Sequence, residues 1–185
     1  MAIDTTNIVI NTERLILRAF SMNDLHDFFE YASVPGVGEA AGWSHHKTIG
    51  DSEKVLQCFL REKEVLALFH KKRRKVIGSL GLHDSWVCGE DGYSDIKAKE
   101  IGFVLSKDYW GQGIMVEAVE AVISYGFKTS GLDAFTCSHF VQNHQSKRVV
   151  EKCGFIFVKN GIFYSGSLEK NLEDLRYIRL REKKS

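Results

Sequence analysis

The sequence predicts a mixed α+β fold, with a twisted, mostly antiparallel sheet of about seven strands and about four helices. Short runs rich in β-branched and aromatic residues recur along the chain and alternate with turn residues, as strands of antiparallel sheets do. Other segments carry apolar residues at helical spacing. One strand at 98–106 leads through a glycine turn into a helix at 113–129 and then into a strand at 132–141. That order predicts a single β-α-β crossover, which is right-handed by default.

The first third of the chain is expected to form one strand and two helices. Residues 8–18 are rich in β-branched side chains and predict the first strand. Capping residue types precede an apolar stripe over 24–32, which predicts the first helix. A proline and several glycines make 35–47 a long loop. The second helix is expected to begin at Asp51 or Ser52.

The middle of the chain is expected to form a hairpin and a loop. Two apolar strands, 64–70 and 76–82, flank a basic tip at 71–75. This tip is either a solvated turn or a patch for nucleic acid or an acidic partner, and we expect the solvated turn. A polar, glycine-containing loop follows at 84–97 and leads to the strand that precedes the glycine turn.

The last third of the chain is expected to form a helix and a closing pair of strands. The segment 143–153 has helical spacing, and Gly154 follows it as the glycine that commonly ends a helix in the left-handed conformation. Residues 155–164 and 174–181 then predict two antiparallel strands that close the sheet.

Length and composition bound the possible functions. A chain of 185 residues predicts one domain over residues 1–185. A net charge of +1 gives no reason to expect nucleic acid as a partner. No apolar stretch approaches the length of a membrane span, and the N-terminus lacks the apolar run of a signal peptide, so we expect a cytoplasmic protein. The cysteines show no C-x-x-C pair, so we expect free thiols and no metal site; they are Cys58, Cys88, Cys137 and Cys153. Monomer and homodimer both stay open.

The glycine turn Gly111-Gln112-Gly113 is the strongest local signal. It joins a strand to a helix, and the first backbone N–H groups of a helix point outward with a positive helix end behind them. This layout is typical of a diphosphate site. The alternative is an ordinary turn in which glycine relieves backbone strain. A Gly-x-Gly turn without a third glycine is not a dinucleotide fingerprint.

Further motifs follow in order along the chain. They are Tyr109-Trp110-Gly111-Gln112-Gly113-x-x-x-Glu117-Ala118, Tyr125-Gly126-Phe127, Asn143-x-x-Ser146 and Glu151-Lys152-Cys153-Gly154-Phe155. Together they resemble the GNAT acetyltransferases, and in particular the branch named for ribosomal-protein N-terminal acetyltransferases. Residues 12–18 and 42–48 are similar to that branch's first strand and to its loop before the second helix. The resemblance covers nearly the whole chain.

The resemblance implies a reaction and a set of site residues. Such proteins bind acetyl-CoA and transfer its acetyl group to an amine. The resemblance places the CoA pyrophosphate on the backbone amides of Gly111, Gln112, Gly113, Ile114, Met115 and Val116. It places the pantetheine arm along the strand at Phe103, Val104 and Leu105. It makes Asn143 a cofactor contact, Ser146 the group that protonates the leaving thiol, and Glu100 the general base.

One departure from the family pattern concerns the phosphate motif. This motif is usually Gln/Arg-x-x-Gly-x-Gly/Ala, whereas this chain has Trp110 at the first position and Met115 at the last. Met115 is bulkier than the usual small residue, so we expect it to narrow the approach to the pyrophosphate.

The residues themselves allow a base at Glu100. Alternation along the strand puts Glu100 on one face with Gly102 and Val104. At pH 7 deprotonation costs about 1 kcal/mol for an α-amine and roughly 4.6 kcal/mol for a lysine. A partly buried glutamate with a raised pKa could remove the proton from either amine through a water. The alternative is a solvent-facing strand glutamate. For Asn143 and Ser146, simple capping of a helix is the alternative.

We therefore expect an acetyl-CoA-dependent N-acetyltransferase in which an amine attacks the thioester directly. No cysteine or serine has a neighbouring histidine and acid in a nucleophile arrangement, so no covalent enzyme intermediate is expected. A backbone N–H near Val104 would stabilise the oxyanion. The acceptor is a small-molecule or peptide amine, and His45, His46 and His83 are candidates to line its pocket. The alternative function is an acyl-CoA-binding sensor or partner protein with the same fold and little catalysis.

Overall fold

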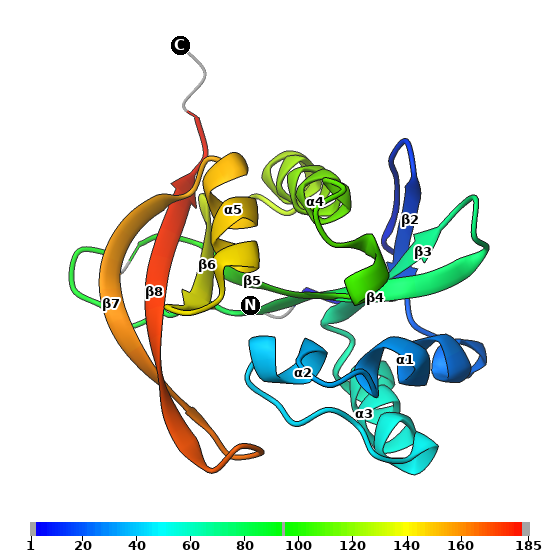
Figure 1. The fold of residues 1–185 in the computed structure, drawn as a ribbon. Helices are drawn as coiled ribbons and strands as arrows, with labels where there is room; N and C mark the ends of the chain where they lie inside the picture. The colour runs from blue at the N-terminus through cyan, green and yellow to red at the C-terminus, as the bar shows by residue number, and fades with distance from the viewer. Residues whose placement is uncertain (1–2, 94, 183–185) are drawn as a thin grey trace.

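The computed structural model describes residues 3–93 and 95–182. Its centre is one eight-stranded sheet with the order β1-β2-β3-β4-β5-β6-β8-β7, in which β5–β6 is the parallel pair and the other neighbours are antiparallel (Figure 1). The predicted fold class, a mostly antiparallel sheet with one β-α-β crossover, is confirmed.

The strands are β1 (Val9–Asn11), β2 (Leu15–Ala19), β3 (Val65–His70), β4 (Lys75–Asp84), β5 (Ala98–Leu105), β6 (Ala134–Phe140), β7 (Ile156–Ser165) and β8 (Lys170–Leu180). The α-helices are α1 (Leu25–Ala32), α2 (Val37–Ala40), α3 (Ile49–Glu62), α4 (Ile114–Thr129) and α5 (His144–Lys152). Two short 3₁₀ turns, η1 (Met22–Asp24) and η2 (Lys107–Tyr109), precede α1 and the glycine turn.

Helices cover both faces of the sheet. Helices α4 and α5 lie on one face, and α1, α2 and α3 lie on the other (Figure 1). Each face has its own apolar core. On the α4 side, Leu80 and Ile101 of the sheet pack with Val119 of the helix, and on the other side Phe28 packs with Leu56. These side chains are at most 2% exposed, so both layers are fixed to the sheet by burial of apolar surface.

The sheet splits between its two parallel strands. Strand β5 pairs with β6 at three positions, Ala98↔Ala134, Lys99↔Phe135 and Glu100↔Thr136. Beyond Glu100, β5 stays paired with β4 as far as Leu105, and β6 stays paired with β8 as far as Phe140, but β5 and β6 no longer pair with each other. The edge of β5 that faces β6 therefore carries no strand partner over its second half, and its backbone polar groups are open to a ligand there.

The first predicted strand is two strands. Residues 8–18 form β1 and β2, which pair as a hairpin. The turn between them is held by Glu117 of α4, whose carboxylate accepts from the Thr12 hydroxyl at 2.5 Å and from the Arg14 backbone N–H at 2.8 Å. This division raises the number of strands from the expected seven or so to eight.

The expected loop at 35–47 is also more ordered than predicted. It contains the single-turn helix α2, which raises the number of α-helices from about four to five in the described residues. The next helix, α3, begins at Ile49 rather than at Asp51 or Ser52. Thr48 is its cap, and the Asp51 side chain accepts from the Thr48 backbone N–H at 2.9 Å, so both residues belong to a capping box.

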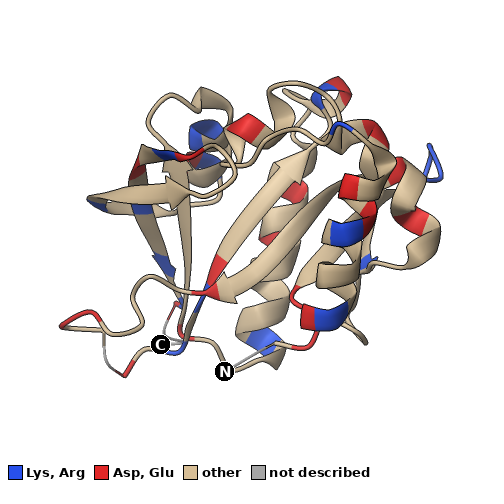
Figure 2. Ribbon diagram, turned by 90° about the horizontal axis from the view of Figure 1, so that it is seen from below, with Lys and Arg blue, Asp and Glu red and all other residues tan. Residues whose placement is uncertain are grey.

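The charged residues are mixed over the surface. Segments with lysine or arginine and segments with aspartate or glutamate are scattered over the helices and strands, and the four exposed cations at 71–74 form the blue turn between β3 and β4 (Figure 2). The exposure of these side chains fits the expected solvated turn as well as a patch for a partner.

Candidate active site

Two clefts meet at the open edge of β5. The first lies between β5, the start of α4, and α5, and has a volume of about 870 Å³ including solvent at its mouth. The second lies between β5, β6 and β8, and has a volume of about 1130 Å³ on the same basis. Five residues line both clefts: Ala40, Ala41, Phe103, Asn143 and Ser146. Two molecules bound in the two clefts would therefore touch at Phe103 and Ser146.

The first cleft brings together nearly all the residues predicted to bind the cofactor. Those that line it are Phe103, Val104, Leu105, Gly111, Gly113, Ile114, Met115, Val116 and Asn143. Gln112 is the exception. Its side-chain amide donates to the Asp108 carbonyl at 2.7 Å, and its own carbonyl accepts from Arg14 at 2.8 Å. Its side chain therefore holds the turn in place.

The glycine turn presents free backbone donors to the first cleft. Gly111 and Gly113 both have φ of +74°, a conformation that other residues adopt only at a cost. Gly113 is the N-cap of α4. The first hydrogen bond of the helix runs from the Glu117 backbone N–H to the Gly113 carbonyl at 3.1 Å. The N–H groups of residues 114–116 consequently have no carbonyl one turn earlier, and they can hold an anion.

The side chain of Met115 was expected to narrow the approach to the pyrophosphate, but it lies mainly in the core. Its residue surface is 4% exposed, and it is part of the main core between α4 and the sheet. It borders the cleft, but its bulk lies mostly within the core.

Cations and an aromatic ring complete the first cleft. Arg148 and Lys152 of α5 line the same cleft as the free amides and add positive charge to its wall. The Trp110 indole N–H donates to the Leu105 carbonyl at 2.8 Å, and the Lys107 ammonium lies 5.8 Å from the centroid of that ring. Trp110 therefore ties the end of β5 to the glycine turn.

Glu100 lies in the second cleft. It is on the face predicted by alternation, the face that carries α1–α3, and it pairs in register with His83 of β4. The Ser138 hydroxyl donates to Glu100 Oε1 at 2.7 Å. Burial raises the pKa of Glu100; the bond from Ser138 and the charge of Arg176 oppose this shift, but the net pKa remains above its ordinary value. A carboxylate with raised proton affinity suits a general base.

Asn143 and Ser146 lie where the two clefts join. The Asn143 side-chain oxygen accepts from the Ser146 backbone N–H at 3.0 Å, which is the cap of α5. Its amide nitrogen donates to the Ala40 carbonyl at 2.9 Å and so links α5 to α2. Asn143 thus has the structural role that the sequence left open, and it also borders both clefts. Ser146 is partly buried there.

The far wall of the second cleft comes from the C-terminal strands. Asp174 is 5% exposed and pairs with Arg176, with 3.3 Å between carboxylate oxygen and guanidinium nitrogen. Phe140 and Phe163 stand beside them, with ring centroids 5.8 Å apart. This cleft thus has an acidic part, at Glu100 and Asp174, and an aromatic part.

Of the three candidate histidines, His83 lines the second cleft. The other two make different contacts. His45 Nδ1 is 2.7 Å from a Glu39 carboxylate oxygen. His46 is buried, with Nδ1 2.6 Å from the Ser52 hydroxyl, and its ring meets Phe28 edge-on.

Several lining residues were not predicted. On α5, Gln145, Arg148, Val149 and Lys152 recur at helical spacing, and that period could have identified them. Val37, Ala40 and Ala41 come from the short α2 region and carry no such signal. Asp174 and Arg176 alternate along β8, but only the pairing of β8 with β6 brings them to the cleft.

Within residues 3–93 and 95–182, no group of three or more histidine, cysteine, aspartate or glutamate side chains is placed to hold a metal ion. None of the helices in this described part is both long and apolar enough to cross a membrane.

Comparison with known proteins places this architecture in a family. Residues 14–156 match the model of the acetyltransferase (GNAT) domain. The uncharacterized N-acetyltransferase YoaA of Bacillus subtilis (strain 168) is 27% identical over 158 residues, which are 80% of this chain and 82% of that protein.

Solved structures share the fold. A GNAT-family acetyltransferase from Bacillus anthracis superposes with a TM-score of 0.78 at 24% identity, covering 94% of this chain and 98% of that one. The ribosomal-protein-S5-alanine acetyltransferase of Vibrio fischeri gives 0.69 at 18% identity, covering 94% and 97%. The spermidine N-acetyltransferase of Vibrio cholerae, in complex with CoA and spermine, gives 0.70 at 16% identity, covering 91% and 96%.

The chain belongs to the acetyltransferase (GNAT) domain family, because the family model matches more than half of its length. It is an N-acetyltransferase, as the resemblance of its motifs indicated. Membership implies transfer of an acetyl group to an amine, and the family uses acetyl-CoA.

Proposed function

We propose that this chain, as one domain over residues 1–185, transfers the acetyl group of acetyl-CoA to a primary amine by direct attack of the amine on the thioester. The observation that carries the proposal is the meeting of two clefts at β5. One cleft has free backbone amides and cations, and the other has the partly buried carboxylate of Glu100. The four cysteines are free thiols, which supports the cytoplasmic location that we propose.

The first cleft suits CoA in charge and in shape. The pyrophosphate would bind the free N–H groups at residues 111–116, and Arg148 and Lys152 would offset its negative charge. The pantetheine arm carries amide groups and would pair with the open edge of β5 at Phe103, Val104 and Leu105. That placement brings the thioester to the junction of the two clefts.

The chemistry follows from the groups at that junction. The acceptor enters the second cleft as an ammonium ion, and Glu100 takes its proton, directly or through a water. The neutral amine then attacks the thioester carbonyl, and a backbone N–H near Val104 stabilises the oxyanion. Collapse of this intermediate breaks the C–S bond. Ser146 gives its proton to the leaving thiolate and takes up the second proton of the amine nitrogen, so the amide is neutral and the serine hydroxyl is restored. No step requires an acetylated side chain of the enzyme.

The lining of the second cleft favours an amine next to an apolar group. Glu100 and Asp174 attract the ammonium, and Phe140 and Phe163 offer aromatic surface to the rest of the acceptor. A protein N-terminus and a small-molecule amine both meet this description. By their names, two solved proteins of this fold act on a ribosomal-protein alanine and on spermidine. An α-amine requires less help from the base than a lysine does.

A free-thiol assay with acetyl-CoA and a panel of peptide and small-molecule amines tests the proposal. We expect acetylation of at least one primary amine, identified by mass spectrometry. In Glu100→Gln, kcat/KM should fall about 10²–10⁴-fold with unchanged affinity for acetyl-CoA. Since the base must be ionised, wild-type activity should decline as pH falls through the raised pKa of Glu100. Binding of acetyl-CoA without acetylation of any amine would favour the alternative, an acyl-CoA sensor.

A further inference from the structure

His83 occupies a hollow in the sheet that two glycines create. Gly81 of β4 and Gly102 of β5 are directly opposite each other in the antiparallel pair, one step from the pair His83 and Glu100. A Cβ atom on Gly81 would lie 2.2 Å from His83 Nε2, and a Cβ atom on Gly102 would lie 3.5 Å from His83 Cδ2. The imidazole therefore leans back over the glycine pair.

The need for glycine at position 81 is one of space. Its φ is not among the positive values found in this chain, so the backbone there suits any residue. The nearest atoms to a side chain at 81 are all in the His83 ring. With glycine at positions 81 and 102, no side chain covers this part of the sheet, and the His83 ring lies over it.

Charged groups surround the ring on several sides. Glu64, just before β3, has a carboxylate oxygen 3.6 Å from His83 Nδ1, and its other oxygen is 3.7 Å from the buried Lys99 ammonium. Lys99 also pairs with Asp84 at 2.8 Å. Glu100 is the cross-strand neighbour of His83. The other charged and titratable groups of the cleft are Asp174 and Arg176 of β8 and His139 of β6.

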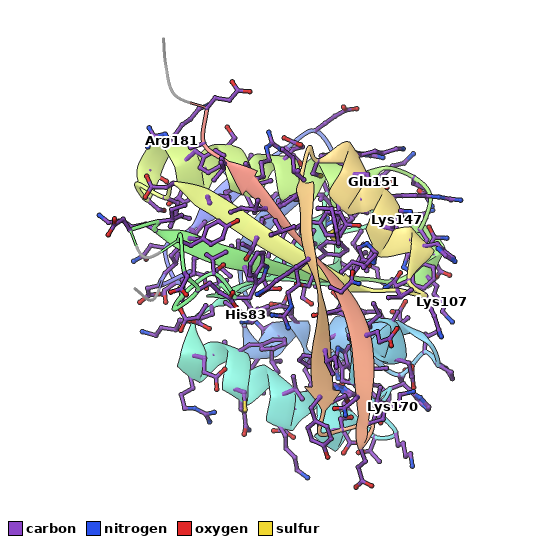
Figure 3. All side chains as sticks on the ribbon, turned by 90° about the vertical axis from the view of Figure 1, so that its left-hand side faces the viewer. His83, Lys107, Lys147, Glu151, Lys170 and Arg181 are labelled. Atoms are coloured by element: carbon purple, nitrogen blue, oxygen red, sulfur yellow. The ribbon has the colours of Figure 1, made fainter. Side chains whose placement is uncertain are left out.

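The position of His83 connects the acceptor cleft with solvent. Figure 3 shows His83 on the side of the sheet that carries α1–α3, the side on which Glu100 also lies. Its side chain is 52% exposed, whereas Glu100 is partly buried. The imidazole therefore borders both the cleft and bulk water.

The proton balance of the proposed reaction calls for such a group. An ammonium acceptor loses two protons on its way to an amide, while the thiolate that leaves takes up one. One proton must therefore reach solvent in each turnover. Glu100 can accept this proton, but its carboxylate is partly buried and must be deprotonated again before the next cycle. Imidazole exchanges protons readily near neutral pH and is suited to relay.

We propose that His83 is a proton relay that carries the released proton from Glu100 and the acceptor to solvent, with Glu64 orienting the imidazole over the Gly81–Gly102 hollow. The inference rests on the proposed function, because it concerns the same acceptor cleft. In each turnover His83 accepts one proton at the cleft and gives one to water, so it ends in its starting state. Glu64 is a positioning residue and touches neither substrate.

The test compares steady-state turnover of wild type and His83→Gln with the acceptor identified in the screen. We expect kcat at pH 7 to fall at least about tenfold and the KM for acetyl-CoA to stay unchanged. Added imidazole should restore turnover in His83→Gln and leave wild type unaffected, because a small buffer can take over the relay. Gly81→Ala should give a partial loss with the same rescue, since the new methyl group displaces the ring.

His26→Gln is the matched control, since His26 is an exposed histidine on α1 outside both clefts. It should behave as wild type with and without imidazole. An active wild type with an equally active His83→Gln would overturn the relay alone. A loss in His83→Gln that imidazole does not restore would also overturn it and would leave His83 a structural residue. A wild type that acetylates no amine would overturn the proposed function and the relay with it.

Discussion

At the scale of single residues, the candidate site depends on Glu100, a carboxylate whose burial disfavours its ionised form. Glu100 is held in a partly buried cleft with one neutral donor, Ser138. Alternation along the strand predicted its face. Its proton affinity could not be predicted from the sequence, because Ser138 and Arg176 reach it from β6 and β8, elements distant in the chain. The environment of Glu100 is therefore a product of the sheet order.

Glu100→Gln should make the protein more stable at neutral pH. The folded pKa of Glu100 is raised, so folding favours its neutral form. This contribution to stability is present below the ordinary glutamate pKa and is lost as pH rises through the folded pKa. At about pH 7 glutamine removes the cost of a buried charge, whereas at low pH the two proteins should differ little. Urea unfolding at both pH values measures this. Equal stability at neutral pH would show that the carboxylate carries no burial cost.

At the scale of elements, the start of α4 presents the proposed pyrophosphate site. Its position follows from glycines at the two turn residues with positive φ, and from Arg14 and Gln112 in hydrogen bonds around the turn. The motif in the sequence predicted the turn, and the helix over 113–129 agreed with α4 within one residue. The sequence could not reveal α2, because four residues are too few for a helical period.

Gly111→Ala should weaken binding of CoA as well as stability. A methyl group there would enter open space at the proposed pyrophosphate site, where nothing lies within 4 Å of the added Cβ. Its backbone cost is about 1–2 kcal/mol, as for any alanine in the left-handed region. Calorimetric titration with CoA and urea unfolding separate the two effects.

Gly131→Ala is the control for that variant. Gly131 also has positive φ and open space around it, but it follows the opposite end of α4. It should lose similar stability and bind CoA as wild type does. If the two alanine variants bind CoA equally well, the glycine turn does not hold the pyrophosphate.

The cap of α5 makes a second prediction at this scale. Asn143→Ala removes the cap and the bond to Ala40, and should cost about 1 kcal/mol or somewhat more in unfolding free energy. Asn143→Asp keeps an oxygen for the cap and loses the donor to Ala40, so its cost should be smaller. Urea midpoints of the three proteins measure this order. If the aspartate variant lost as much as alanine, the link to α2 would be the main contribution of Asn143.

At the scale of the whole molecule, the split between β5 and β6 creates both clefts. The β-α-β crossover and the closing strands were predicted from local patterns. The division of residues 8–18 into β1 and β2 was not, because the turn is fixed by Glu117, 103 positions from Arg14 along the chain. The position of the split was equally hidden, since only the register of β5 with β6 shows where pairing stops.

The two clefts share Phe103 and Ser146, so the account requires both substrates on the enzyme at once. Initial-rate kinetics with acetyl-CoA and the acceptor varied together test this most directly. Direct transfer predicts intersecting double-reciprocal lines, and an enzyme incubated with acetyl-CoA alone that carries no acetyl group by intact mass. Parallel lines together with a stable acetyl-enzyme would contradict the account, because they would show a covalent intermediate and acceptor binding only after CoA has left.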